Sequence, residues 1–86
     1  MKNKMKLPKW FDGTVYEKGD TVTNPFSGET YELNNLELSM YDFIMGLNYM
    51  FEALGNISSD KHIKMHQDAL SWFRTHNAKA YMVLLD

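Results

Sequence analysis

His62 and His66 are the residues of this 86-residue chain whose spacing most resembles a reactive site, because they lie four positions apart in His-Ile-Lys-Met-His. On a helix this spacing lets two imidazoles share one metal ion. The glutamate of a metalloprotease helix is absent, Lys64 lies between the two histidines, and the chain has no cysteine. We therefore expect no metal and no cofactor, with one histidine exposed and the other at the edge of an apolar stripe.

Asp42 is the second candidate for chemistry, because it lies between Tyr41 and Phe43 in an apolar stretch. A carboxyl group buried there would have a raised pKa and could act as an acid. Such a residue more often pairs with a lysine, caps a neighbouring segment or faces solvent. The serines lack a nucleophile motif, and the glycines before residue 30 are isolated rather than gathered in a phosphate-binding loop. We expect no enzymatic activity.

Charge is unevenly distributed along the chain. Residues 10–60 carry nine acids and one lysine, whereas the first nine residues carry no acid. The N-terminal lysines are Lys2, Lys4, Lys6 and Lys9. Together with the aromatic pair Trp10 and Phe11, this tail could contact nucleic acid through phosphates and stacked bases. The acidic body disfavours such binding over most of the surface, so nucleic acid remains an alternative partner.

The secondary-structure elements that position these residues are predicted next, and the first of them along the chain are β-strands. Residues 14–33 predict a three-stranded antiparallel meander, with strands at 14–17, 21–23 and 29–33 and with Gly- and Pro-containing turns between them. The residues expected to point inward are Val15, Val22, Tyr31 and Leu33. So small a sheet must pack against a helix.

Helices are predicted over the rest of the chain. The first covers 34–54, and Asn34 and Glu37 have the spacing of a capping box at its start. The second covers about 59–75. Residues 78–85 are ambiguous between a helix and a strand, and Asn77 as a helix N-cap favours the helix. The fold class is therefore α+β, with about three strands packed on two to three helices.

The long first helix is apolar on nearly every side, which is unusual for a surface helix of a small domain. Gly46, in its middle, suggests the close approach of another backbone. Tyrosine, tryptophan and methionine are enriched at interfaces. The candidate interface residues are Met40, Tyr41, Met45, Tyr49, Met65 and Trp72. The alternative is that these side chains form the domain's own core.

The size of the chain favours association. We expect a basic flexible tail at 1–9 and a single domain at 10–86. A domain this small is marginally stable unless disulfides, a metal or oligomerisation add to its core. Without cysteine or a convincing metal site, oligomerisation has the most support, with a homodimer as the first expectation. No stretch of about 20 residues is apolar enough to predict a membrane span.

Three motifs resemble short uncharacterised proteins encoded by tailed phages of marine cyanobacteria. They are the turn Asn24 to Gly28, the helix start Leu33 to Ile44 and the end Trp72 to Asp86. Those proteins often have proline where this chain has Ala78. The resemblance implies a phage product in the cytoplasm of an infected bacterium, or in the virion, but transfers no activity and no catalytic residue.

Together these observations predict a non-enzymatic protein that acts through protein–protein contacts, first with a second copy and then with a host or phage protein. One alternative is a weak nucleic-acid binder that uses the N-terminal lysines. The other is a small-ligand binder with a pocket near Asp42 or His66.

Overall fold

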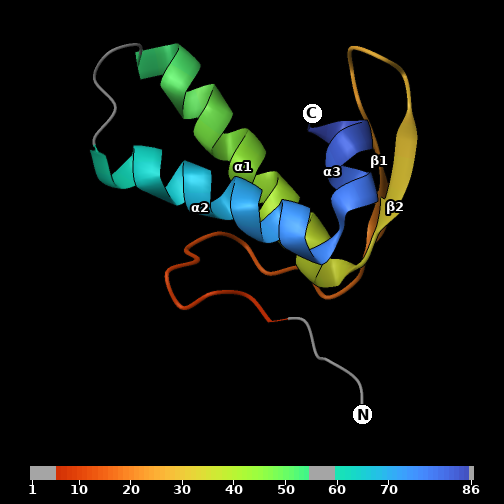
Figure 1. Ribbon diagram of the computed structural model, residues 1–86, viewed down its shortest axis with the longest axis horizontal. Coiled ribbons are helices and arrows are strands. Elements are labelled where there is room, and N and C mark those ends of the chain that lie inside the picture. Colours follow the sequence, from red (N-terminus) through yellow and green to blue (C-terminus); the bar gives the residue numbers. More distant parts are fainter. Residues whose placement is uncertain (1–5, 55–59, 86) are drawn as a thin grey trace.

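The computed structural model describes residues 6–54 and 60–85, which form an α+β domain. Its elements are β1 (Asp20–Thr23), β2 (Thr30–Leu33), α1 (Asn35–Leu54), α2 (Asp60–His76) and α3 (Ala78–Leu84). The two strands form a hairpin beside α3, and α1 and α2 extend from this end of the molecule toward the other (Figure 1).

The hairpin is held by its turn as much as by its strands. β1 and β2 pair antiparallel, with Val22 opposite Tyr31. In the turn, Asn24 Oδ1 accepts a hydrogen bond from the Phe26 amide at 2.8 Å, and the Gly28 amide donates to the Asn24 carbonyl at 2.8 Å. Gly28 has a φ of 80°, which glycine adopts without steric cost. The predicted Asn-Pro-x-Ser-Gly turn is therefore present.

The first predicted strand, residues 14–17, is not a strand in the structure. The Tyr16 amide donates to Ser39 Oγ at 2.9 Å, and the Tyr16 carbonyl accepts from Asn35 Nδ2 at 3.3 Å. Side chains of α1 thus satisfy the backbone groups that a neighbouring strand would have used. Val15, predicted to point inward, is 58% exposed.

The predicted starts of the first and last helices are confirmed, whereas the start predicted near residue 59 lies outside the described residues. Asn34 and Glu37 form a complete capping box, because Asn34 Oδ1 accepts from the Glu37 amide at 2.8 Å and Glu37 Oε1 accepts from the Asn34 amide at 2.9 Å. Residues 78–84 are helical, and Asn77 Oδ1 accepts from the Ala80 amide at 3.1 Å. Asn77 Nδ2 also donates to Glu37 Oε2 at 2.9 Å. One buried carboxylate therefore joins the start of α1 to the start of α3.

The core lies where the three helices and β2 meet. Its fully buried members include Leu33, Met40, Ile44, Ala69, Phe73 and Ala80. Met40 is 0% exposed and Tyr41 is 9% exposed, with the Tyr41 ring 6.5 Å from the Phe73 ring. Burial raises the pKa of the Tyr41 hydroxyl above 10.0. The prediction that Met40 and Tyr41 form an interface is therefore wrong for the folded chain, because both belong to its own core.

The N-terminal segment is not a free tail from residue 6 onward. The Trp72 indole N–H donates to the Lys6 carbonyl at 3.0 Å, and the rings of Phe11 and Phe43 lie 5.0 Å apart. A Cβ on Gly13 would lie 2.8 Å from the Phe11 ring, so the chain passes closely over that side chain. Residues 1–5 of the predicted tail lie outside the described residues. Among residues 6–54 and 60–85 no helix has the length and apolarity that a bilayer crossing requires.

Candidate functional site

One side of α1 faces solvent and forms the first candidate surface. Its residues recur at steps of three and four, which places them on one helical stripe. We name this stripe the α1 outer face, and it consists of Asp42, Met45, Gly46, Tyr49, Glu52 and Ala53. Tyr49 is 74% exposed and Met45 is 36% exposed. The face therefore presents a tyrosine and a methionine between two carboxylates.

Gly46 leaves an opening in the middle of the α1 outer face. A Cβ built on this glycine would meet no atom within 4 Å among the described residues. Glycine inside a helix costs about 1 kcal/mol relative to alanine, and no contact within the described chain requires its small size. The sequence prediction that Gly46 marks the approach of another backbone therefore remains a prediction about a partner.

Asp42 lies at one end of this face and is exposed, not buried among its apolar neighbours. Its carboxylate is close enough to Tyr16 to raise the pKa of that hydroxyl above 10.0, and burial and a hydrogen bond between the two side chains contribute in the same direction. Asp42 therefore serves as an acceptor for Tyr16. Its exposure agrees with the alternative that this carboxylate faces solvent.

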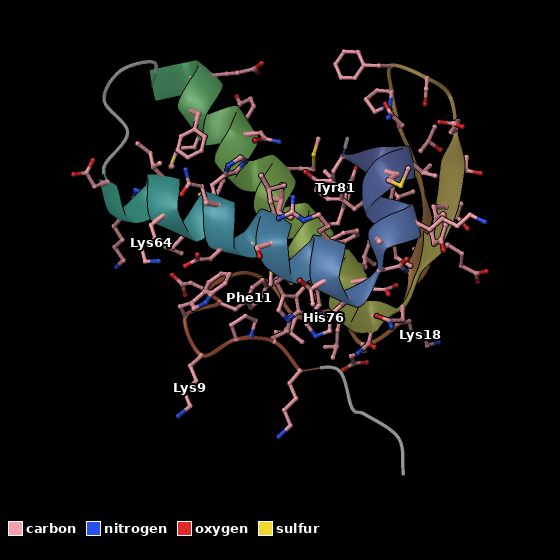
Figure 2. The ribbon with its side chains drawn as sticks, in the orientation of Figure 1. Lys9, Phe11, Lys18, Lys64, His76 and Tyr81 are labelled. Atoms are coloured by element: carbon pink, nitrogen blue, oxygen red, sulfur yellow. The ribbon has the colours of Figure 1, made fainter. Side chains whose placement is uncertain are left out.

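A cleft between the N-terminal segment and α2 forms the second candidate surface. We name it the aromatic cleft; its volume is about 720 Å³, and Lys9, Trp10, Phe11 and Asp12 line one side. Residues of the first turns of α2 line the other side and include Lys61, His62, Lys64 and Met65. In Figure 2, Lys64 lies on α2, and Lys9 and Phe11 lie on the segment that passes below this helix.

The cleft combines apolar walls with charges of both signs. Lys64 Nζ forms an ion pair with Asp68 at 3.2 Å. Lys9 and Lys61 are exposed at the rim, together with the carboxylates of Asp12 and Asp60. Of the lysines predicted to contact anions, Lys6 and Lys9 are exposed, while Lys2 and Lys4 lie outside the described residues. Because acids and bases both lie at the rim, the cleft is less suited to bind a polyanion than to bind a partner that inserts an apolar group.

The two histidines of the possible metal site are engaged in different surroundings. His66 Nε2 lies 2.7 Å from Asn48 Oδ1, and its ring packs edge-on against Phe51 at 5.2 Å. His62 lines the aromatic cleft. Within the described part of the chain no three His, Cys, Asp or Glu side chains are grouped so that they could hold a metal. The contacts of His66 thus serve to pack α2 against α1.

His66 predicts a pH dependence of stability. Burial lowers its pKa below the ordinary value of 6.5, so the unfolded chain binds a proton more readily than the folded chain. The stability that neutral His66 contributes is present above 6.5 and is lost as the pH falls through its folded-state pKa. Urea unfolding at about pH 8 and about pH 5, on either side of an ordinary histidine pKa, should show a lower midpoint in acid.

His66→Gln is the matched variant for this pH test, because glutamine can still donate to Asn48 Oδ1 but does not titrate. His62 and His76 are retained in both proteins, so their contributions cancel in the comparison. The variant should lose part of the dependence on pH. Equal slopes for the two proteins would show that His66 is not responsible.

The hairpin turn carries a third exposed apolar feature. Phe26 is 96% exposed at the tip between β1 and β2, and the hydrogen bonds of Asn24 hold its backbone. Asn24 Nδ2 also donates to the Val83 carbonyl at 2.9 Å, which ties the turn to α3. Sequence reasoning placed Phe26 in a turn without marking it as a site. A large aromatic residue at the centre of a turn was the signal that could have identified it.

The structure separates the six residues predicted to form one interface. Met45 and Tyr49 share the α1 outer face, whereas Met40 and Tyr41 are in the core. Met65 lines the aromatic cleft. Trp72 stacks on His76 with ring centroids 4.2 Å apart and donates to Lys6, so the N-terminal segment covers part of it.

The chain matches no protein-family model, no curated protein and no solved structure.

Proposed function

We propose that this protein acts without catalysis, through contacts with other protein chains, and forms a homodimer through the α1 outer face. The observation that supports this proposal is the exposed Tyr49 one helical turn from Gly46, above which the described chain leaves open space. Tyrosine and methionine are enriched at interfaces, and a glycine on a helix surface permits another backbone to approach closely.

A twofold contact suits the pattern of this face. In such a contact the same patch meets itself. If two copies of α1 cross near Gly46, Tyr49 of each copy reaches the open space above the glycine of the other. Each copy then buries a tyrosine ring and part of Met45. Aromatic anchors of this kind dominate the binding energy of many interfaces.

The charges on the α1 outer face predict how salt affects the dimer. Asp42 and Glu52 flank the apolar residues, and the stripe has no cation. Bringing two such faces together places like charges near one another. Salt screens this repulsion, so the dimer should become tighter as ionic strength rises. A complex with nucleic acid would become weaker instead.

We extend the proposal to the setting that the sequence motifs suggest. The resemblance to proteins of tailed cyanobacterial phages supports a phage product in an infected bacterial cytoplasm, where it serves as a virion accessory component or as a modulator of a host protein. A host or phage protein would then be the next partner after the second copy.

The dimer is tested by replacing Tyr49 with glutamate and measuring absolute mass by light scattering across a dilution series. The wild-type chain should have twice the mass of one chain, and Tyr49→Glu should be a monomer with unchanged helix content, because the added charge would have to be buried against two carboxylates. Met82→Glu is the control, since it places the same charge at an exposed apolar residue of α3 rather than of α1.

Gly46→Leu gives an independent readout of the same contact. Leucine is a better helix former than glycine, and its Cβ would meet nothing within 4 Å in the single chain, so the variant should resist thermal unfolding better as a monomer. Its side chain would fill the space that the partner needs, so the dimer should be lost. A wild-type chain that remains a monomer at every concentration contradicts the proposal.

A further inference from the structure

The tip of the hairpin is built as a rigid apolar projection. Phe26 is 96% exposed, and its amide donates to Asn24 Oδ1 at 2.8 Å. Three further hydrogen bonds hold Asn24. Its amide donates to the Glu29 carbonyl, its carbonyl accepts from the Gly28 amide, and its Nδ2 donates to the Val83 carbonyl. Because the backbone that carries this side chain is already ordered, binding does not have to order the turn as well. Phe26 is therefore prepared to enter a complementary pocket.

The aromatic cleft offers such a pocket on the same chain. Trp10, Phe11 and Met65 supply apolar walls, and the volume of about 720 Å³ lies within the range of about 300–1,000 Å³ that is usual for ligand sites. Aromatic rings and methionine sulfur both make favourable contacts with an inserted phenyl ring. The cleft is thus large enough for a phenylalanine and has suitable chemistry.

The two features lie at opposite ends of the molecule, so they cannot meet within one copy. The turn between β1 and β2 projects beyond α3 at one end, whereas the first turns of α2 lie at the other and the N-terminal segment passes below α2 (Figure 1). The longest dimension of the chain is 42 Å. A tip at one end and a cleft at the other fit a head-to-tail contact between copies.

A charge pairing between the two ends is possible in the same arrangement. From Asp20 to Leu33 the hairpin carries three acids and no base: Asp20, Glu29 and Glu32. Lys9 and Lys61 are exposed at the rim of the cleft, where the carboxylates of Asp12 and Asp60 also lie. Glu29 is three residues from Phe26, so it can meet an opposite charge at this rim when the ring enters the cleft. Because the rim carries charges of both signs, it favours the orientation that brings Glu29 to a lysine and keeps it away from Asp12 and Asp60.

We infer that Phe26 of one copy inserts into the aromatic cleft of a second copy, with Glu29 directed to Lys9 or Lys61. The contact is heterologous, so each copy keeps one free tip and one free cleft, and the assembly grows into a ring or an open chain. It buries a small area and should therefore be weak and appear at high protein concentration. It deepens the proposed self-association but uses none of the residues of the α1 outer face.

Analytical ultracentrifugation of Tyr49→Glu separates this contact from the proposed dimer. At high concentration the mass of this variant should still increase, and added salt should reduce the increase because opposite charges are screened. Adding Phe26→Ser to the same protein should abolish it. An increase in mass that persists without Phe26 overturns the inference. The inference is also overturned if the mass of Tyr49→Glu never exceeds that of one chain. Neither result bears on whether the wild type dimerises through α1.

Mixing two blocked proteins tests the head-to-tail geometry, both in the Tyr49→Glu background. One carries Phe26→Ser and keeps its cleft; the other carries Lys61→Glu with Met65→Glu and keeps its tip. Neither protein should increase in mass when it is alone, whereas the mixture should give a complex of one copy of each and nothing larger. If the protein with Met65→Glu does not fold, Lys61→Glu alone takes its place. Adding Glu29→Lys to the Lys61→Glu protein should then restore its increase in mass at high concentration. Failure of both the mixture and the charge exchange overturns the inference.

Discussion

Replacing Glu37 with alanine is expected to lower the free energy of unfolding by about 3 kcal/mol, because hydrogen bonds to a charged group are strong and costly to leave unmade. Glu37 is buried, and its two oxygens accept from the Asn34 amide at 2.9 Å and from Asn77 Nδ2 at 2.9 Å. Alanine removes both acceptors at once. The start of α1 and the start of α3 then lose their direct connection.

The measurement is urea unfolding followed by circular dichroism, with Glu32→Ala as the matched control. Glu32 is exposed on β2, so its removal should change the unfolding free energy by no more than about 0.5 kcal/mol. A loss at Glu37 no larger than the loss at Glu32 would contradict the prediction.

Glu37→Gln should recover only part of this stability. A glutamine oxygen can accept from one donor, but its amide nitrogen would then face the other. Asn77 cannot relieve this conflict by turning its side-chain amide over, because its oxygen accepts from the Ala80 amide at 3.1 Å. The variant should therefore lie between the wild type and Glu37→Ala in the same experiment.

Gly19→Ala is expected to be destabilising by about 3 kcal/mol, because added atoms that press on a closely packed backbone force it to shift. The new Cβ would overlap the Leu33 carbonyl oxygen and lie 2.8 Å from Asn34 Cα. Both atoms belong to the backbone between β2 and α1. That backbone can move only by disturbing the pairing of Asp20 with Leu33 or the cap at Asn34.

Gly46→Ala, in the Tyr49→Glu background that keeps the chain monomeric, is the control for this second prediction. The same change of one methyl group meets nothing within 4 Å there, and alanine is favoured over glycine in a helix by about 1 kcal/mol. The two glycine variants should therefore shift the thermal midpoint in opposite directions. A Gly19→Ala protein as stable as its parent would show that the backbone yields at little cost.

The predictions from sequence that are confirmed rest on short-range signals. The capping box of Asn34 and Glu37, the Asn77 cap and the turn at Asn24 each involve residues within about five positions. Their geometry follows from local hydrogen bonding. The α+β class follows in the same way from the order of turn-rich and helical segments.

The predictions that are wrong depend on partners far away in the sequence. Residues 14–17 have the composition of a strand, yet Tyr16 bonds to Ser39, 23 residues later. Met40 and Tyr41 lie on a helix that is apolar on several sides, and only the positions of α2 and α3 decide which side is covered. The aromatic cleft joins residues about fifty positions apart, and no local pattern indicates it.

The hydrogen bond from Asn24 to the Val83 carbonyl spans 59 positions of the chain, and it limits the order in which the protein can fold. A hairpin with four-residue strands is marginal by itself, so its turn becomes fixed only once α3 has docked. The bond from Asn77 to Glu37, across 40 positions, links that docking to α1. Contacts so distant in sequence slow folding because long loops must close first. The last elements to settle are therefore expected to be the ones that present Phe26.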